Sequence, residues 1–137
     1  LIHAAGSGVG VAATQIARLF GARVAVTASS RAKLDKAAAN GAEHLIDYTT
    51  EDFGKRVREL TGKAGADIVV DTIGGENLAK SIASVRKGGR VVTCGATAGY
   101  QVTFNVAQVF FKSVSLLGST MGSGAELREM KQYLAAK

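Results

Sequence analysis

A glycine-rich turn near the start of the chain constrains its fold more than any other feature. Apolar residues lead into glycines at positions 6, 8 and 10, and small apolar residues then follow at helical spacing. This succession predicts the end of a strand, a tight turn and the start of a helix. The first N–H groups of such a helix have no partner within it, and its dipole favours an anion. We therefore expect a cradle for a diphosphate.

The glycine pattern can be read in two registers. Counted from Gly6, the motif ends on Val11 instead of a glycine, whereas counted back from Gly10, small residues replace its first two glycines. We prefer the second register, in which the N–H groups of Val9 and Gly10 face the phosphates and Gly10 lets the helix pack closely on the sheet. A turn with a purely structural role is the alternative.

The composition predicts one globular domain without a membrane segment. The chain has 137 residues, of which 47% are hydrophobic, and no apolar run approaches the roughly 20 residues needed to cross a bilayer. No signal peptide is recognisable, so we expect a cytoplasmic protein. Because the first residue already belongs to an apolar strand, we expect 1–137 to be part of a longer protein.

Cysteine count and charge exclude further classes of protein. Cys94 is the only cysteine, which excludes an intrachain disulfide, and its place after an apolar strand predicts a buried core thiol. The net charge is +6, but basic residues are scattered among acidic ones and no aromatic platform could stack bases, so we expect no nucleic-acid partner. A basic balance instead suits an anionic cofactor.

Predicted strands and helices alternate along the chain. We expect strands at 1–3, 23–27, 44–47, 67–71, 90–94 and 114–118, and helices at 8–20, 30–40, 51–58, 76–85, 106–112 and from 125. Ser29 or Ser30 should cap the second helix, Thr49 or Thr50 the third, and 87–89 should form a turn. Right-handed crossovers then predict an α/β fold, a doubly wound parallel sheet in the order 3-2-1-4-5-6.

The end of the second strand favours NADP over NAD. NAD sites usually place an acidic residue there to accept hydrogen bonds from the ribose, but the first carboxylate here is Asp35, inside the next helix. The residues that suit the additional 2′-phosphate of NADP are Ser29, Ser30, Arg31, Lys33 and Tyr48. An ordinary solvated helix start is the alternative for the two basic residues.

We expect the titratable residues elsewhere in the chain to have structural roles and not catalytic ones. Asp71 is expected to hold N–H groups of the loop that follows it instead of serving as an acid. His3 is expected to be a satisfied core histidine, and neither it nor His44 has a metal-ligand partner at a useful spacing. Tyr133 and Lys137 have the tyrosine–lysine spacing of short-chain dehydrogenases, but the other signatures of that class are missing. We predict no catalytic and no metal-binding residue here.

Four segments together carry a resemblance that covers the whole chain. They are residues 3–10 (HAAGSGVG), 41–48 (GAEHLIDY), 71–75 (DTIGG) and 88–92 (GGRVV). They resemble the cofactor domain of the medium-chain dehydrogenases/reductases, which has the Rossmann fold, and most of all the NADPH:quinone oxidoreductase branch with its zinc-type relatives.

The resemblance implies that the cofactor is NADP(H), and it implies which residues contact each part of the cofactor. It implies that Ser29, Ser30, Lys33 and Tyr48 hold the 2′-phosphate, that Val9 and Gly10 hold the diphosphate, that 73 and 95–97 border the cofactor, and that nicotinamide contacts fall at 119–121. The whole expected cofactor-binding set is Gly6, Ser7, Gly8, Val9, Gly10, Ser29, Ser30, Arg31, Lys33, Tyr48, Ile73, Gly95, Ala96, Thr97, Ser119, Thr120 and Met121.

The resemblance further implies an oxidoreductase that moves hydride between nicotinamide and a quinone, enone, aldehyde or alcohol. It implies a homodimer paired edge to edge at Ser113 to Gly118, and a preceding catalytic domain that would hold any zinc. We therefore expect this domain to bind NADP(H) and to turn over little substrate alone. A non-catalytic nucleotide-sensing module is the alternative. An adenosylmethionine-dependent methyltransferase is a weaker one, because the second strand lacks the acid expected for ribose.

Overall fold

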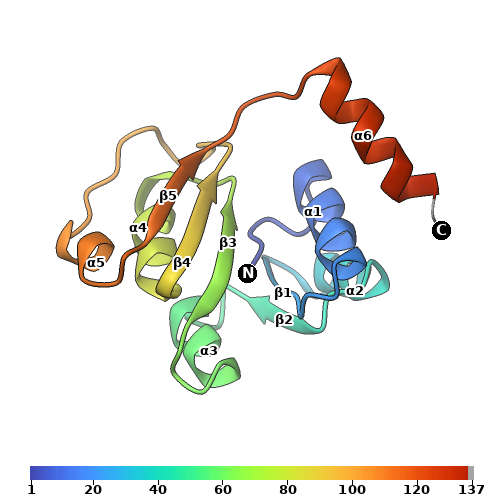
Figure 1. Ribbon diagram of the computed structural model, residues 1–137. Coiled ribbons are helices and arrows are strands. Elements are labelled where there is room, and N and C mark those ends of the chain that lie inside the picture. Colours follow the sequence, from blue (N-terminus) through green and yellow to red (C-terminus); the bar gives the residue numbers. More distant parts are fainter. Residues whose placement is uncertain (136–137) are drawn as a thin grey trace.

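The computed structural model describes residues 1–135, in which helices and strands alternate (Figure 1). The elements are α1 (Gly8–Leu19), β1 (Ala25–Ala28), α2 (Arg31–Ala39), β2 (His44–Asp47), α3 (Phe53–Leu60), β3 (Ala66–Asp71), α4 (Gly75–Ser84), β4 (Val85–Thr93), α5 (Ala107–Phe110), β5 (Ser115–Gly118) and α6 (Gly124–Ala135). Every pair of neighbouring strands within these residues is parallel. The α/β class with a parallel sheet is therefore confirmed.

The strands fall into two groups that a short segment joins. β1 pairs with β2, and β3, β4 and β5 pair in that order. The strand end predicted at the start of the chain is too short to form an element of its own. Ile2 instead makes isolated bridges to Val26 of β1 and Val70 of β3. The N-terminus consequently lies between the two groups of strands (Figure 1).

The helices cover both faces of the strands, as the alternation of side chains along β1 requires. Val26 is fully buried in a cluster with Leu34 and Ala37 of α2, against which Ala17 of α1 also packs. Its neighbour Ala25 packs on the opposite side, against the cluster of α3 that includes Phe53 and Val57. α1 and α2 thus lie on one face and α3 on the other.

A third cluster fills the space beside β3 and β4. It joins Val69 and Val91 of these strands to Leu78 and Ile82 of α4, and all four side chains are buried. Of the apolar run in β3, Val69 is fully buried and Val70 is half-buried, whereas Ile68 is 48% exposed.

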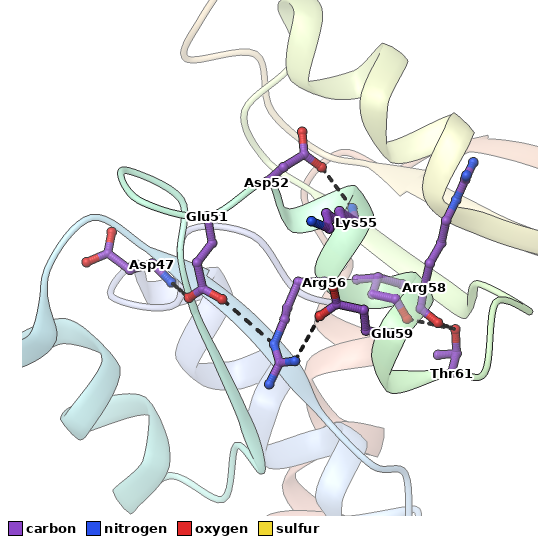
Figure 2. A network of polar contacts seen from close by, with 9 residues as sticks. Asp47, Glu51, Asp52, Lys55, Arg56, Arg58, Glu59 and Thr61 are labelled. Atoms are coloured by element: carbon purple, nitrogen blue, oxygen red, sulfur yellow. Dashed lines mark hydrogen bonds and ion pairs between the residues drawn. The ribbon is translucent and has the colours of Figure 1, made fainter.

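The N-terminus of α3 differs from the prediction. Its cap is Asp52, whose carboxylate accepts the Lys55 N–H at 2.8 Å, and not Thr49 or Thr50 (Figure 2). The two threonines serve the end of β2 instead. The Thr49 N–H and hydroxyl donate to the Asp47 carboxylate at 3.0 and 2.6 Å, and the Thr50 N–H donates to the Asp47 carbonyl at 3.1 Å.

A chain of polar contacts continues from this turn along α3 (Figure 2). Glu51 accepts the Asp47 N–H at 3.2 Å and lies 3.7 Å from Arg56, which is also paired with Glu59 at 3.0 Å. These ion pairs are partly exposed, and such pairs contribute about 0–1 kcal/mol each. Their effect is to fix the loop between β2 and α3 more than to stabilise the fold.

The predicted turn at 87–89 lies inside a strand. β4 runs through these residues, Gly88 has a φ of 71°, and its N–H donates to the Lys112 carbonyl at 2.7 Å. A Cβ on Gly89 would lie 2.8 Å from the Asp67 carbonyl oxygen. The glycine pair therefore allows a close approach of β3 and β4 where their register shifts, instead of reversing the chain.

α6 lies apart from the strands and reaches the rest of the domain through an aromatic contact (Figure 1). The rings of Phe20, at the end of α1, and Tyr133 have centroids 5.5 Å apart. None of the helices among residues 1–135 combines the length and apolar character that crossing a membrane requires.

Candidate functional site

The glycine turn has the geometry that the sequence predicted for the start of a helix. Ser7 caps α1, and its hydroxyl accepts the Gly10 N–H at 3.0 Å. A Cβ at position 10 would clash with the carbonyl oxygen of Ala4, whose own φ is 52°. Glycine is therefore required at position 10 by the close approach of α1 to the segment that precedes it.

The N–H groups open to an anion at this turn differ by one position from those expected. The Gly10 N–H is already given to Ser7. Among the described residues, the N–H groups of Gly8 and Val9 have no acceptor, and Val9 is 48% exposed. These two groups lie at the positive end of the helix dipole, so the turn fits a phosphate through Gly8 and Val9.

Lys33 extends from the first turn of α2 to the glycine turn. A Cβ on Gly6 would lie 3.5 Å from its Cγ and Cδ, so the lysine stem covers this glycine. Its ammonium donates to the Ser29 hydroxyl at 3.2 Å, just beyond the end of β1. The structure thus brings Gly6, Ser29 and Lys33 together at one edge of the strands.

The other residues predicted for the 2′-phosphate are arranged differently. Arg31 is exposed, and its Nε forms an ion pair with the Asp35 carboxylate at 2.8 Å. Ser30 takes the cap position of α2, but its side chain makes no capping hydrogen bond. Tyr48 follows β2, and because β1 and β2 are in parallel register it emerges at the same edge as Ser29, with its N–H bonded to Ala28 O at 3.2 Å.

The carboxylate nearest this edge is held toward its own loop through one of its two oxygens. Asp47 is the acid closest to it in sequence, but its side chain accepts two hydrogen bonds from Thr49. These bonds lower the pKa of Asp47 below its ordinary value, so it stays charged and turned toward its own loop.

Asp71 has the structural role predicted for it. Its carboxylate is fully buried and accepts the N–H groups of Ile73 and Gly74 at 2.8 and 2.9 Å. The second oxygen accepts from the Asn77 amide at 3.0 Å and from the Ser81 hydroxyl at 2.7 Å. Four donors thus hold the charge and fix the loop after β3.

His3 continues this buried network and is a satisfied core histidine, as predicted. Its Nδ1 lies 2.9 Å from the Thr27 hydroxyl and its Nε2 lies 3.0 Å from the Ser81 hydroxyl. Because Ser81 gives its single hydrogen to Asp71, the His3 Nε2 must carry the proton and Nδ1 must accept from Thr27. Burial lowers the pKa of His3 from 6.5 to about 4, against the smaller opposing effect of Asp71. His3 is therefore neutral at pH 7.

The loops after β3 and β4 are bonded to each other. The Gly75 N–H donates to Gly99 O at 3.0 Å, and the Ala98 N–H donates to Ile73 O at 2.8 Å. A Cβ on Gly95 would lie 2.7 Å from the Thr72 carbonyl oxygen. Residues 73 and 95–97, all predicted to border the cofactor, are thereby brought to one edge of the sheet.

The residues after β5 are more open. Ser119 is anchored by its N–H, which donates to Thr93 O at 3.0 Å, whereas Met121 is 97% exposed. Cys94 lies between these segments and is exposed, so the prediction of a buried core thiol is wrong. The strand ends at Thr93, and the thiol falls on the carboxyl edge instead of a covered face. Partial desolvation, with the charge of Asp71, raises the pKa of Cys94.

A hollow of about 450 Å³ adjoins this edge beside α4. Tyr48 and Ile73, two of the predicted residues, line it together with Asn77 and Lys80. The sequence reasoning missed Asn77 and Lys80. The signal that could have found them is their helical spacing of three residues, in a helix that follows directly from the loop held by Asp71.

The described residues contain no group of three or more His, Cys, Asp or Glu side chains that could hold a metal ion. Tyr133 lies on α6, remote in sequence from the glycine turn, whereas its predicted counterpart Lys137 is outside the described residues.

Comparison with known proteins agrees with this geometry. The family model described as zinc-binding dehydrogenase matches residues 8–136. The human quinone oxidoreductase is 30% identical over 136 residues, which are 99% of this chain and 40% of that protein. A crystal structure described as an NAD-dependent alcohol dehydrogenase is 47% identical with a TM-score of 0.89, over 97% of this chain and 39% of that one.

A further solved structure contains the reduced cofactor. The Escherichia coli quinone oxidoreductase in complex with NADPH is 28% identical, with a TM-score of 0.84, over 97% of this chain and 42% of that one. The chain thus spans about two fifths of the length of the relatives it matches. It belongs to the zinc-binding dehydrogenase family of medium-chain dehydrogenases/reductases, and corresponds to the Rossmann-type cofactor-binding domain of that family.

Proposed function

We propose that this chain is the NADP(H)-binding domain of an oxidoreductase that transfers hydride between nicotinamide and a quinone, enone, aldehyde or alcohol. The observation that carries the proposal is the position of Lys33, which covers Gly6 and reaches the Ser29 hydroxyl. In this proposal its ammonium, just beyond the end of β1, recognises the 2′-phosphate, while hydrogen bonds from Thr49 hold the nearby Asp47 carboxylate toward its own loop. The NADPH complex of a relative supports the same cofactor.

The residues present fit a dinucleotide in three parts. The N–H groups of Gly8 and Val9 would hold the diphosphate at the start of α1, where the helix dipole favours negative charge. Lys33 and the hydroxyl of Ser29 would hold the 2′-phosphate, with Tyr48 beside them. Arg31 contributes less in this proposal, because its exposed side chain is directed to Asp35.

The nicotinamide half would lie toward the loops after β3, β4 and β5. When bound, the cofactor would supply the hydride to a quinone, enone or aldehyde, or accept it from an alcohol. The chain's own residues orient it: Asp71 fixes the Ile73 and Gly74 N–H groups, and the bond from Ala98 to Ile73 holds the neighbouring loop. We propose that substrate contacts and any zinc come from a further domain of the whole protein, so that the isolated chain binds cofactor and turns over little.

The test is a calorimetric titration of the chain with NADPH and with NADH at one fixed salt concentration. We expect NADPH to bind at least about tenfold more tightly, because a charge-assisted phosphate contact is worth about 1.5–3 kcal/mol. Lys33→Ala should remove most of this preference and leave NADH binding nearly unchanged. The comparison of NADPH with NADH is needed because one of the similar structures is described as an NAD-dependent alcohol dehydrogenase.

Lys36→Ala is the matched control, since Lys36 lies on the same helix in its last turn. It should preserve the preference for NADPH. Equal loss in the two variants would mean that only overall charge matters, and NADH preference in the unmodified chain would overturn the NADP assignment. Absence of binding by a folded chain would overturn the proposal and leave the glycine turn with a purely structural role.

We also propose that the whole protein is a cytoplasmic homodimer paired through 113–118. β5 pairs with β4 on one side, and all four of its residues are exposed. Leu116 and Leu117 are 40% and 44% exposed, which is unusual for apolar side chains at a free sheet edge. Analytical ultracentrifugation should find dimers that Leu117→Lys converts to monomers; dimers that persist in this variant would argue against the edge.

A further inference from the structure

A second hollow lies at the edge of the strands opposite the predicted cofactor residues. Its volume is about 540 Å³, within the range of small-molecule sites. It is lined by α3 and the loop after it, the end of α4, the start of β4, and Lys112, which follows α5. Helices that connect parallel strands run back against them, so α3 and α4 end at the amino edge of the strands. The hollow is therefore separate from the carboxyl edge that bears the glycine turn.

The charged residues that line this hollow are mostly basic. They are Lys55, Arg58, Lys63, Lys112 and a single acidic residue, Glu59. The carboxylate of Glu59 is paired with Arg56 at 3.0 Å (Figure 2). None of the four basic side chains forms an ion pair with a carboxylate of residues 1–135. The hollow thus carries an excess of positive charge.

Arg58 is directed into the hollow, whereas its neighbour Arg56 is not. The two residues are two positions apart on α3, which places them about 200° apart around the helix. Arg56 is held by Glu51 and Glu59, while Arg58 extends toward α4, with which it lines the hollow (Figure 2). Lys55 lies three residues before Arg58 and therefore on the same face of the helix.

Lys112 brings a fixed charge to the hollow from the side of α4. Its ammonium donates to the carbonyls of Ala83 and Val85 at 2.9 and 2.8 Å. The third contact, to Ile82 O, is 3.5 Å long, at the limit of a hydrogen bond, so one N–H is available to a ligand. Burial, and then the like charge of Arg58, lower the pKa of Lys112. An anion between the two side chains would relieve their repulsion.

The loop between α3 and β3 holds Lys63 at the rim of the hollow. Gly62, Lys63 and Gly65 have φ values of 59°, 73° and 97°, a region that lysine rarely adopts. The Lys63 N–H donates to Arg58 O at 2.6 Å, and a Cβ on Gly65 would lie 2.7 Å from Ser84 O. The close packing of this loop on the ends of α3 and α4 therefore maintains the strained lysine, as is common at ligand-binding positions.

We propose that this hollow binds the phosphate group of a small molecule, with Arg58 as the main contact and Lys55, Lys63 and Lys112 around it. A guanidinium can donate two parallel hydrogen bonds to a phosphate, and the lysines add charge. A phosphate carries close to two negative charges at neutral pH, which suits this excess of positive charge better than one carboxylate does. The ligand would bridge α3 and α4 at the edge away from the glycine turn.

The test is an NMR titration of the isotope-labelled chain with glucose 6-phosphate and with inorganic phosphate, at constant ionic strength. We expect saturable shifts of the amide signals of 62–65 and 83–85, which line the hollow. Arg58→Gln should weaken this binding about tenfold or more, because a charge-assisted contact is lost. Tighter binding of glucose 6-phosphate would identify an organic phosphate as the ligand, and the opposite order would identify inorganic phosphate itself.

Arg56→Gln is the matched control, since it makes the same change of charge on the same helix outside the hollow. It should preserve the affinity. Equal weakening in the two variants would mean that the anions respond only to overall charge, and would overturn the proposal. Absence of saturable shifts at 62–65 and 83–85, or shifts confined to Gly8 and Val9, would also overturn it. Lys33→Ala should leave these shifts unchanged, so that failure of the NADP(H) assignment is distinguishable from failure of this site.

Discussion

The imidazole Nε2 of His3 lies 3.0 Å from the Ser81 hydroxyl, which joins a residue between the two groups of strands to a residue of α4. Ser81 in turn donates to Asp71 at 2.7 Å. A buried neutral histidine thus contacts the carboxylate that fixes the loop after β3 through one hydroxyl. This link gives the fold a pH dependence that is open to measurement.

We expect the free energy of unfolding to fall as the pH drops from 6.5 to about 4. The folded pKa of His3 is about 4 and the unfolded value is 6.5, so within this window the unfolded chain binds a proton that the folded chain does not. The loss should be on the order of 3 kcal/mol. Urea unfolding at a series of pH values measures it, and His3→Gln should flatten the slope across this window. Equal slopes in the two proteins would show that His3 is not the titrating group.

Asp71→Asn should destabilise the domain by about 1.5–3 kcal/mol, because buried hydrogen bonds to a charged acceptor become weaker or are lost. It should also weaken NADPH binding, since the N–H groups of Ile73 and Gly74 lose their charged acceptor. Asp67→Asn is the matched control, because Asp67 is exposed and paired with Arg86, where the expected cost is about 0–1 kcal/mol. Urea unfolding and calorimetry measure the two effects. Similar costs in both variants would refute the role given to Asp71.

Gly10→Ala should destabilise the domain by about 1–3 kcal/mol, because the added Cβ would clash with Ala4 O. Gly8→Ala introduces the same methyl group on the same helix, where no atom lies within 4 Å. It should be neutral or slightly stabilising. Thermal unfolding of the two variants gives the comparison, and a neutral Gly10→Ala would mean that α1 can move away from the turn.

Asp52→Ala should cost about 1 kcal/mol through loss of the α3 cap, whereas Thr50→Ala should cost clearly less. Thr50 makes a long side-chain contact of 3.4 Å to the Asp47 carbonyl and does not cap the helix. Chemical unfolding at pH 7 distinguishes the two. The reverse order would restore the threonine cap that the sequence suggested.

The sequence was informative where one local pattern had one physical solution. His44–Asp47 was predicted to the residue, because an apolar run lies between a glycine stop and a polar turn. The role of Asp71 followed from its place at a strand end before glycines. The predicted NADP contacts of Lys33 and Ser29 are still predictions, although the structure brings the two side chains together.

The errors arose where two local solutions competed. Thr49, Thr50 and Asp52 can all cap a helix, and only the three-dimensional turn shows that Asp47 engages the threonines. The pair Gly88 and Gly89 reads as a reversal, but the nearby Asp67 backbone uses it for close approach within a continuous strand. Neither the position of the helix cap nor the role of the glycine pair can be deduced from the few residues that a local sequence pattern covers.

The segment 1–5 has a consequence for how the domain unfolds. Its backbone pairs with β1 through Ile2 and with β3 through Leu1 and His3, and within residues 1–135 it is the sole stretch in the sheet that pairs with both groups of strands. Cooperativity between the two halves therefore depends on these few peptide bonds, on the His3 network, and on Val70 and Ala66 of β3, which pack against the clusters beside β1 and α3. Weakening the contacts of segment 1–5 would allow the β1–β2 half to unfold at a lower temperature than the β3–β5 half. A single thermal unfolding transition would then become two.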